Sequence, residues 1–227
     1  MTDAFSPSEC GRAVAAALFD TGCVMARRDE PFRLPSGWAS PVYMDCRRLI
    51  SFPAVRRDLV ARGLQLLREQ GALRDVVSVA GGEASGIALA AWMAEALDLP
   101  LEYVRKKQAG QTRIVGVVKP GDKVLMVDDL MAAGQSKVAF CKALAAAGAV
   151  VEDLFVVFDY AAFPNRHILD ALKLRVHALA TWRDVLAVAR EQGRLDGAAL
   201  KELAEFLDDP AGWSQAHGGI AAYHYDK

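Results

Sequence analysis

The sequence lacks the features that mark several large classes of protein. It contains no apolar run of 18 residues, and its first residues, Met-Thr-Asp, do not begin a basic and then apolar signal segment, so we expect neither secretion nor a membrane span. The four cysteines are far apart and form no Cys-x-x-Cys pair, which argues against a zinc site and a disulfide framework. The sequence therefore favours a protein of the reducing cytoplasm. The cysteines are Cys10, Cys23, Cys46 and Cys141.

Charge balance and missing motifs exclude further classes. The net charge is -1, so the chain lacks the broad basic field of a nucleic-acid-binding protein, and we expect no nucleic acid partner. Neither a Gly-Lys-Ser/Thr P-loop nor a Gly-x-Gly-x-x-Gly motif is present. The histidines share no spacing typical of a metal site. Any anion site must therefore be built from other residues.

From residue 76 onward, apolar segments of strand length alternate with segments of helical periodicity. This alternation predicts an α/β fold with a mostly parallel central sheet flanked by helices. We expect one domain over residues 1–227, in which 1–50 form an N-terminal helix and an irregular cap, and 210–227 form a loosely held tail. The expected strands are residues 76–80, 101–104, 124–127, 154–158 and 174–179, and the expected helices are residues 7–23, 53–70, 87–97, 135–147, 184–190 and 198–207.

Residues 123–137 carry the clearest candidate site. The apolar run 124–127 predicts a buried strand, which leads into Asp128 and Asp129, a small-residue loop and a helix. Carboxylates at a strand end can accept the paired hydroxyls of a ribose, while the loop and the helix N-terminus favour a phosphate. A ribose 5-phosphate fits both halves. The alternative is a polar turn in which Ser136 caps the helix.

Two further stretches could serve the same site. Residues 80–86, Ala-Gly-Gly-Glu-Ala-Ser-Gly, form a second strand-to-helix turn, which should face the same crevice because parallel strands end along one edge. Alone, this stretch is equally typical of a plain tight turn. Arg105, Lys106 and Lys107 open a basic, flexible stretch after the next strand. Such a run is often a solvated face, but here it could neutralise an anionic ligand.

Two motifs resemble a known family. The strand, the aspartate pair and the loop to Ser136 resemble the phosphoribosyl pyrophosphate (PRPP) motif of type I phosphoribosyltransferases, although Ala132 replaces the usual threonine. Losing that hydroxyl donor would cost about 1–3 kcal/mol if nothing replaces it. Residues 32–45 read Phe-x-Leu-x-Ser-Gly-x-x-Ser-Pro-x-Tyr-x-Asp, which closely resembles the N-terminal signature of orotate phosphoribosyltransferases. The resemblance runs from about residue 32 to residue 190.

This resemblance implies transfer of the 5-phosphoribosyl group from PRPP to orotate, giving orotidine 5'-monophosphate and pyrophosphate in pyrimidine biosynthesis. It implies Mg²⁺ held mainly by PRPP, with no direct protein ligand. It also implies a homodimer in which a mobile loop, opened by Arg105 and Lys106, closes over the neighbouring subunit's site. Residues 32–45, called the hood below, would cover the base.

The site residues that the resemblance implies fall into three groups. The catalytic residues are Lys106, Asp128 and Asp129. The PRPP-binding residues are Gly82, Glu83, Ala84, Ser85, Arg105, Lys106, Lys107, Asp128, Asp129, Ala132, Ala133, Gly134, Gln135 and Ser136. The orotate-binding residues are Pro35, Tyr43, Met44, Ala132 and Tyr160.

Departures from the family pattern leave the identity of the base open. Besides Ala132, Pro35 stands where many members have lysine or threonine, and Tyr160 stands where many have an arginine that helps to hold the orotate carboxylate. The substitutes nearest in sequence are Arg47, Arg48 and Arg166. One alternative is therefore a phosphoribosyltransferase for another base. A second is a PRPP-sensing regulator that binds nucleic acid, although the chain shows no basic face. Tyr43 could also simply pack within an ordinary cap.

Overall fold

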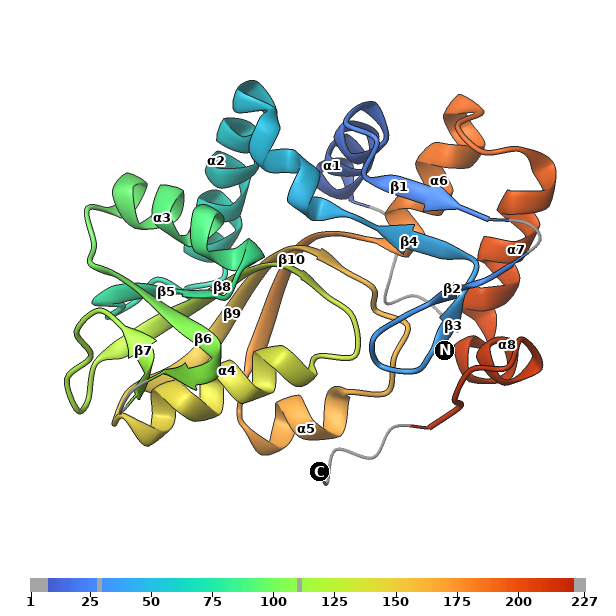
Figure 1. Cartoon of the computed structure of the whole chain (residues 1–227). Coiled ribbons are helices and arrows are strands. Elements are labelled where there is room, and N and C mark those ends of the chain that lie inside the picture. The colour runs from blue at the N-terminus through green and yellow to red at the C-terminus, as the bar shows by residue number, and fades with distance from the viewer. Residues whose placement is uncertain (1–7, 28–29, 110–111, 223–227) are drawn as a thin grey trace. The chain divides into compact units, whose positions relative to one another are not determined.

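A computed structural model of the chain describes residues 8–27, 30–109 and 112–222 (Figure 1). The helices are α1 (Glu9–Asp20), α2 (Pro53–Glu69), α3 (Ser85–Leu97), α4 (Gln135–Ala146), α5 (Arg166–Ala171), α6 (Trp182–Gln192), α7 (Gly197–Asp208) and α8 (Pro210–Ala216), with a 3-10 helix at Cys46–Ser51. The strands are β1 (Val24–Ala26), β2 (Phe32–Arg33), β3 (Ala39–Ser40), β4 (Val42–Met44), β5 (Ser78–Gly82), β6 (Leu101–Ala109), β7 (Thr112–Val115), β8 (Lys123–Met131), β9 (Val150–Asp159) and β10 (Arg175–Thr181). This content confirms the predicted fold class.

The central sheet has the strand order β10-β9-β8-β5-β6-β7. Strand β5 runs parallel to both of its neighbours, β6 and β8, whereas β7 returns antiparallel to β6. The register pairs Gly82 with Val104 and Gly81 with Val127, so the carboxyl ends of these three parallel strands share one edge. Asp128 follows Val127 on that edge, where ligands bind in open α/β sheets.

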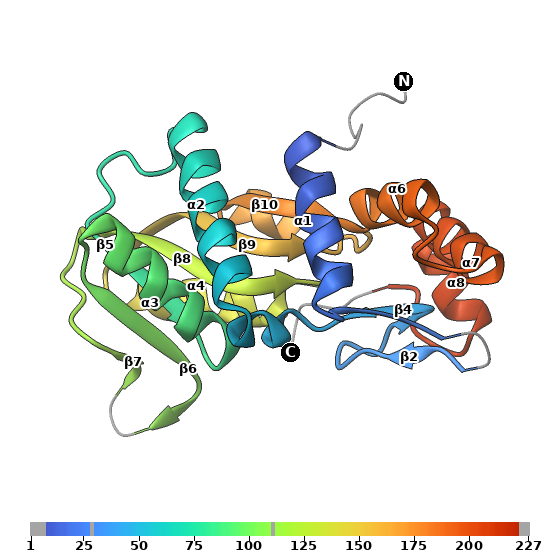
Figure 2. The same cartoon turned by 90° about the horizontal axis from the view of Figure 1, so that it is seen from above.

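Helices cover both faces of this sheet, with α2 and α3 on one face and α4 and α5 on the other (Figures 1 and 2). Helix α2 approaches so closely that a Cβ on Gly63 would lie 2.5 Å from the ring of Phe155 on β9. On the other face, Phe140 and Leu144 of α4 join Met126 of β8 in one buried cluster. Covering both faces explains why the inner strands are continuous apolar runs.

The described chain divides into two compact units. One comprises residues 56–158 and 165–179 and holds most of the central sheet; the other comprises residues up to 55, 159–164 and those from 180 onward. In the second unit α1 packs on α6, α7 contacts both α6 and α8, and the pairs β1–β4 and β2–β3 form small antiparallel sheets. No helix in the described ranges combines the length and the apolar composition needed to cross a membrane. The predicted single domain over residues 1–227 stays a prediction.

Helix α1 begins later than the sequence suggested. The Ser8 side chain caps it, accepting a hydrogen bond from the Gly11 N–H at 2.8 Å, whereas the predicted start near Pro7 lies outside the described residues. Gly11 leaves room for α6, since a Cβ there would overlap the carboxylate of Asp184. The capping serine and the small residue together fix this end of the helix.

The C-terminal segment differs from the expected loose tail. Residues 210–216 form α8, and Ser214 at its centre is 0% exposed. The Ser214 hydroxyl accepts a hydrogen bond from the Ala39 N–H of β3 at 2.9 Å and donates one to the Ile220 carbonyl at 2.7 Å. These bonds hold a glycine- and alanine-rich segment that offers few apolar side chains for packing. Residues 223–227 lie outside the described part of the chain.

Candidate active site

Asp128 and Asp129 lie inside β8, because that strand continues to Met131 instead of ending before the pair as predicted. The two residues are 2% and 8% exposed. Asp128 Oδ1 accepts the Asp129 N–H at 2.9 Å, and Asp129 Oδ1 accepts the Leu130 N–H at 2.8 Å. Backbone groups thus orient both carboxylates. Two buried carboxylates still require further partners, because burying an uncompensated charge is costly.

One of these partners is Lys137, a residue that the sequence reasoning did not single out. Its ammonium nitrogen lies 2.7 Å from Asp128 Oδ2, and the residue is only 8% exposed although it belongs to the first turn of α4. A lysine after Ser136 looks like an ordinary solvated helix residue in the sequence. The one available signal was its place at a helix N-terminus, where a positive charge is disfavoured.

The second partner, Ser85, links the two predicted loops. Its hydroxyl donates to Asp129 Oδ1 at 3.0 Å and lies 3.4 Å from Asp128 Oδ1. Glycine permits this approach, since a Cβ on Gly86 would lie 2.8 Å from Asp128 Oδ1 and one on Gly82 would lie 3.0 Å from Asp128 Oδ2. The structure therefore brings the 80–86 turn and the aspartate pair to one place, as the parallel sheet predicted.

Burial and neighbouring charges both act on the Asp129 carboxylate. Burial raises the pKa of Asp129 above its ordinary value, and the neighbouring charge of Asp128 raises that pKa further, while Lys137 and the Ser85 hydrogen bond lower it. A buried carboxylate is a strong hydrogen-bond acceptor, and an added hydroxyl donor would stabilise its charged form. The site is therefore arranged to take up a ligand hydroxyl.

Residues 132–136, called the ligand loop below, lead from β8 into α4. Gly134 has φ 88°, a left-handed conformation that favours glycine, and it precedes the helix without any side-chain cap. The Ser136 capping alternative is thus wrong. Asn165, which the sequence reasoning also missed, donates from Nδ2 to the Ala132 carbonyl at 3.3 Å. Ala133 and Gly134 are buried, Ala132 and Ser136 are half-buried, and Gln135 is exposed.

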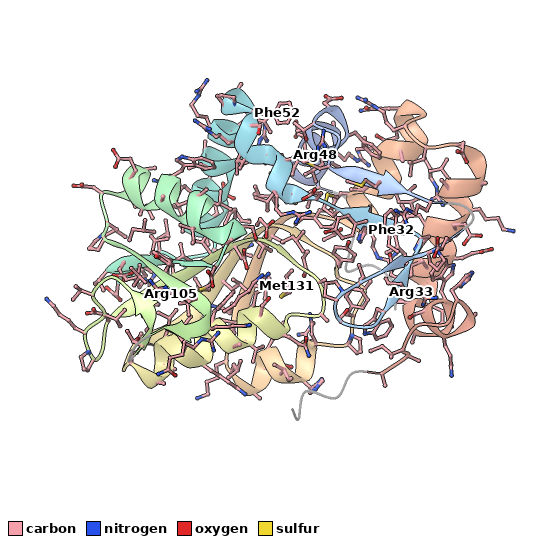
Figure 3. All side chains as sticks on the ribbon, in the orientation of Figure 1. Phe32, Arg33, Arg48, Phe52, Arg105 and Met131 are labelled. Atoms are coloured by element: carbon pink, nitrogen blue, oxygen red, sulfur yellow. The ribbon has the colours of Figure 1, made fainter. Side chains whose placement is uncertain are left out.

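The basic stretch is a strand where a flexible loop was expected. Arg105, Lys106 and Lys107 belong to β6, which pairs with β7 through Tyr103–Val115, Val104–Ile114 and Ala109–Thr112, with an irregular register between (Figure 3 labels Arg105). Arg113 ties the hairpin by donating to the carbonyls of Arg105 and Lys106 at 2.9 and 3.0 Å. Glu83 accepts the Lys106 N–H at 2.6 Å, so the 80–86 turn is bonded to this strand. The Lys106 and Lys107 side chains are exposed.

The hood residues belong to the other unit. Tyr43 is half-buried and stacks on Phe32 at 5.5 Å between ring centroids, and the Arg27 guanidinium lies 4.4 Å from the centroid of that Phe32 ring. Pro35 is exposed, whereas the Met44 side chain is buried. Of these three residues expected to bind orotate, Pro35 and Tyr43 are accessible in this structure and Met44 is not.

Tyr160 is buried, whereas a residue that contacts a ligand would be expected to be accessible. Its hydroxyl accepts the Met44 N–H at 3.1 Å, and its ring meets that of Trp182 edge to face. It braces β4 in this structure, and a direct contact with orotate stays a prediction. Two of the three arginines proposed for the carboxylate are also engaged: Arg47 with Asp45 at 2.5 Å, and Arg48 with the Thr21 carbonyl at 3.0 Å. The third, Arg166, lies 3.8 Å from Asp170 and is largely exposed.

A mostly parallel sheet with an aspartate pair ahead of an uncapped helix N-terminus is the arrangement of the type I phosphoribosyltransferases. Solved structures agree with this class. The chain superposes on UMP synthase of Leishmania donovani with a TM-score of 0.77 and 27% identity, over 87% of this chain and 42% of that longer one. It also superposes on orotate phosphoribosyltransferase from Aeropyrum pernix with a TM-score of 0.68 and 26% identity, over 81% and 99%.

Sequence relatives specify the family further. The chain is 42% identical over 212 residues to a protein of Rhizobium rhizogenes (strain K84 / ATCC BAA-868) named orotate phosphoribosyltransferase, covering 92% of this chain and 91% of that one. A protein of the same name from Rhizobium meliloti (strain 1021) is 42% identical over 213 residues. No model of a protein family matches the chain. At this identity and coverage, the chain belongs to the orotate phosphoribosyltransferase family.

Proposed function

We propose that the chain transfers the 5-phosphoribosyl group of PRPP to orotate, giving orotidine 5'-monophosphate and pyrophosphate. The bond from ribose C1 to the pyrophosphate oxygen breaks, a bond from C1 to pyrimidine N1 forms, and N1 gives up its proton. The observation that carries the proposal is the buried aspartate pair held by Ser85 beside the ligand loop, in a chain 42% identical to named relatives.

The residues divide the work by charge. Asp129 and Asp128 would accept the ribose hydroxyls, while N–H groups of the ligand loop and the N-terminus of α4 would hold the 5-phosphate. Lys106, Arg105 and Lys107 would meet the charge of the leaving pyrophosphate. As C1 gains positive charge, the carboxylates also stabilise it.

Mg²⁺ fits this site as a companion of PRPP. No three His, Cys, Asp or Glu side chains in the described ranges converge to hold a metal ion, so the ion would be held mainly by the phosphate oxygens and ribose hydroxyls of PRPP, with no direct protein ligand. When bound, the ion would neutralise part of the pyrophosphate charge.

A cytoplasmic homodimer with shared sites is part of the proposal. Lys106 is exposed on strand β6 of the β6–β7 hairpin, from which its long side chain could reach a partner subunit. Mixing Lys106→Ala subunits with Asp129→Asn subunits, each inactive alone, should restore part of the activity, because some mixed dimers hold one intact site. No recovery, with subunit exchange verified, would argue for sites within single subunits.

The direct test is an assay with PRPP and Mg²⁺ and, separately, orotate, uracil, hypoxanthine and adenine. Nucleotide should form with orotate. If nucleotide forms only with another base, the protein would be a phosphoribosyltransferase for that base. This is the second candidate function, because the buried Tyr160 stands at the position where many family members have an arginine. PRPP binding without any turnover would favour the regulator.

A further inference from the structure

Lys137 occupies a position that costs the fold energy twice. It is 8% exposed, so its ammonium group is largely removed from water, and it lies in the first turn of α4, where the helix dipole disfavours a positive charge. Neither cost serves the packing of α4, whose buried face is formed by apolar residues such as Phe140 and Leu144. A residue held in this way needs an electrostatic reason.

That reason lies in the carboxylates of β8. The Lys137 ammonium is 2.7 Å from Asp128 Oδ2 and 3.5 Å from the Ser136 hydroxyl. Asp128 and Asp129 are the charged groups that face it, and Ser85 supplies the remaining side-chain donor. The other strands packed on α4 meet it through apolar residues such as Val104 and Ile114. One cation thus serves two adjacent buried anions.

The ion pair also spans the ligand loop. Asp128 precedes the loop on β8 and Lys137 follows it on α4, so the pair joins its two ends. The residues of the loop carry no bulky apolar side chain, and Asn165 contacts the loop from outside through the Ala132 carbonyl. Loop N–H groups bind a phosphate well only if they are oriented beforehand.

We propose that Lys137 is a positioning residue for PRPP, which holds the Asp128 carboxylate in place and ties the first turn of α4 to β8 so that the ligand loop is preformed for the 5-phosphate. This inference rests on the proposed function for the identity of the ligand. It assigns a role to a residue outside the aspartate pair and the loop.

The test uses PRPP with Mg²⁺ as the titrant and calorimetry as the readout, so it needs no base. Lys137→Met should weaken PRPP binding by at least about tenfold, because the charge-assisted pair that holds Asp128 and the loop is lost. Lys142→Met, an exposed lysine on the same helix, is the matched control and should bind as the wild type does. In the Asp128→Asn background, adding Lys137→Met should change affinity less than about threefold, since the pair is already broken.

A pH series separates positioning from a purely structural role. Without Lys137, the pKa of Asp129 loses a charge that lowers it, so the acidic limb of PRPP binding should move upward. Lys137→Gln, whose amide can still donate to Asp128 but carries no charge, should show the same displacement even if the methionine variant fails to fold. Wild-type affinity and an unmoved acidic limb in Lys137→Gln would overturn the proposal.

The outcomes separate this inference from the proposed function. If wild-type protein binds PRPP but makes no orotidine 5'-monophosphate, while the Lys137 variants lose PRPP affinity as expected, the function falls and the inference stands. If turnover with orotate is normal and the Lys137 variants retain wild-type PRPP affinity, the function stands and the inference falls.

Discussion

The ligand loop and the hood hold their residues by different physical means. Around the ligand loop, the structure buries three charged side chains, Asp128, Asp129 and Lys137, and balances them against one another. The hood, residues 32–45, buries no charged side chain and is held by aromatic stacking and by neutral hydrogen bonds to the Ala39 and Met44 N–H groups. If the ligand loop binds the phosphate and the hood binds the base, as proposed, phosphate recognition depends on charge and base recognition depends on shape and stacking.

Replacing the aspartate pair should have the largest effect on the charge-dependent ligand loop. Asp128→Asn with Asp129→Asn should reduce turnover by more than about 10³-fold, because the ribose clamp loses both carboxylates. Lys137 also loses its ionic partner, so the melting temperature should fall by several degrees. Steady-state kinetics and thermal melts measure both. Asp122→Asn, just before the same strand, is the control, and near-normal turnover by the double variant would show that the motif was misread.

Lys106 tests the role of charge at the position where pyrophosphate would leave. Lys106→Ala should lower kcat by about 10²-fold with a smaller change in PRPP affinity, because its charge is needed most as pyrophosphate departs. Lys119→Ala, an exposed lysine before β8, should leave kcat unchanged. A loss confined to the KM for PRPP would instead place Lys106 in ground-state binding.

Tyr43 tests whether the hood recognises the base by shape and stacking. Tyr43→Ala should raise the KM for orotate about tenfold or more while leaving the KM for PRPP unchanged, because aromatic stacking on a base contributes about 1–3 kcal/mol. Tyr43→Phe keeps the ring stacked on Phe32 and should behave as the wild type does. Equal changes in both KM values would mean that Tyr43 supports the fold and not the base.

Asp159, in the same unit as the hood, is a carboxylate whose pKa is set chiefly by burial. Burial raises its pKa to about 6, although its Oδ1 accepts the Ala161 N–H. Because the folded protein favours the protonated form, this group stabilises the fold fully below pH ~4 and loses that effect as the pH rises through ~6. Asp159→Asn should therefore be more stable than wild type above pH ~6, by at most about 3 kcal/mol, and the advantage should vanish in acid. Chemical denaturation below pH ~4 and above pH ~6 measures the difference in unfolding free energy between the variant and the wild type. A difference that does not change with pH would contradict this prediction.

The smallest effect is expected at the neutral contact between α8 and the hood. Ser214→Ala leaves the Ala39 N–H and the Ile220 carbonyl without this partner and should cost about 1–2 kcal/mol of unfolding free energy. The KM for orotate should rise only a few-fold, with that for PRPP unchanged. Gln215→Ala, which changes an exposed neighbour on α8, is the control. Equal stability of the two variants would show that the Ser214 hydrogen bonds do not stabilise the contact between α8 and the hood.

The sequence predicted the parts of the molecule whose signals are local. Apolar runs located the inner strands, and the order of strand, carboxylates and small residues located the ligand loop. It did not reveal Lys137 or Asn165, because their roles depend on contacts formed only in the fold. The β6–β7 hairpin was missed because its charged, exposed residues show no alternation, and α8 because one buried serine, not an apolar face, holds it to the hood.

The Ser214 contact also bears on the order in which the protein folds. The unit that carries the hood is assembled from three separate stretches of chain, and its β3 strand is bonded to a helix 175 residues away in sequence. Such long-range contacts form late, because the entropy of closing the intervening chain opposes them until the rest is in place. During synthesis the sheet and the ligand loop can fold first, whereas the hood cannot be secured until residues 210–222 have left the ribosome. A nascent chain would therefore form the proposed phosphate site before the proposed base site.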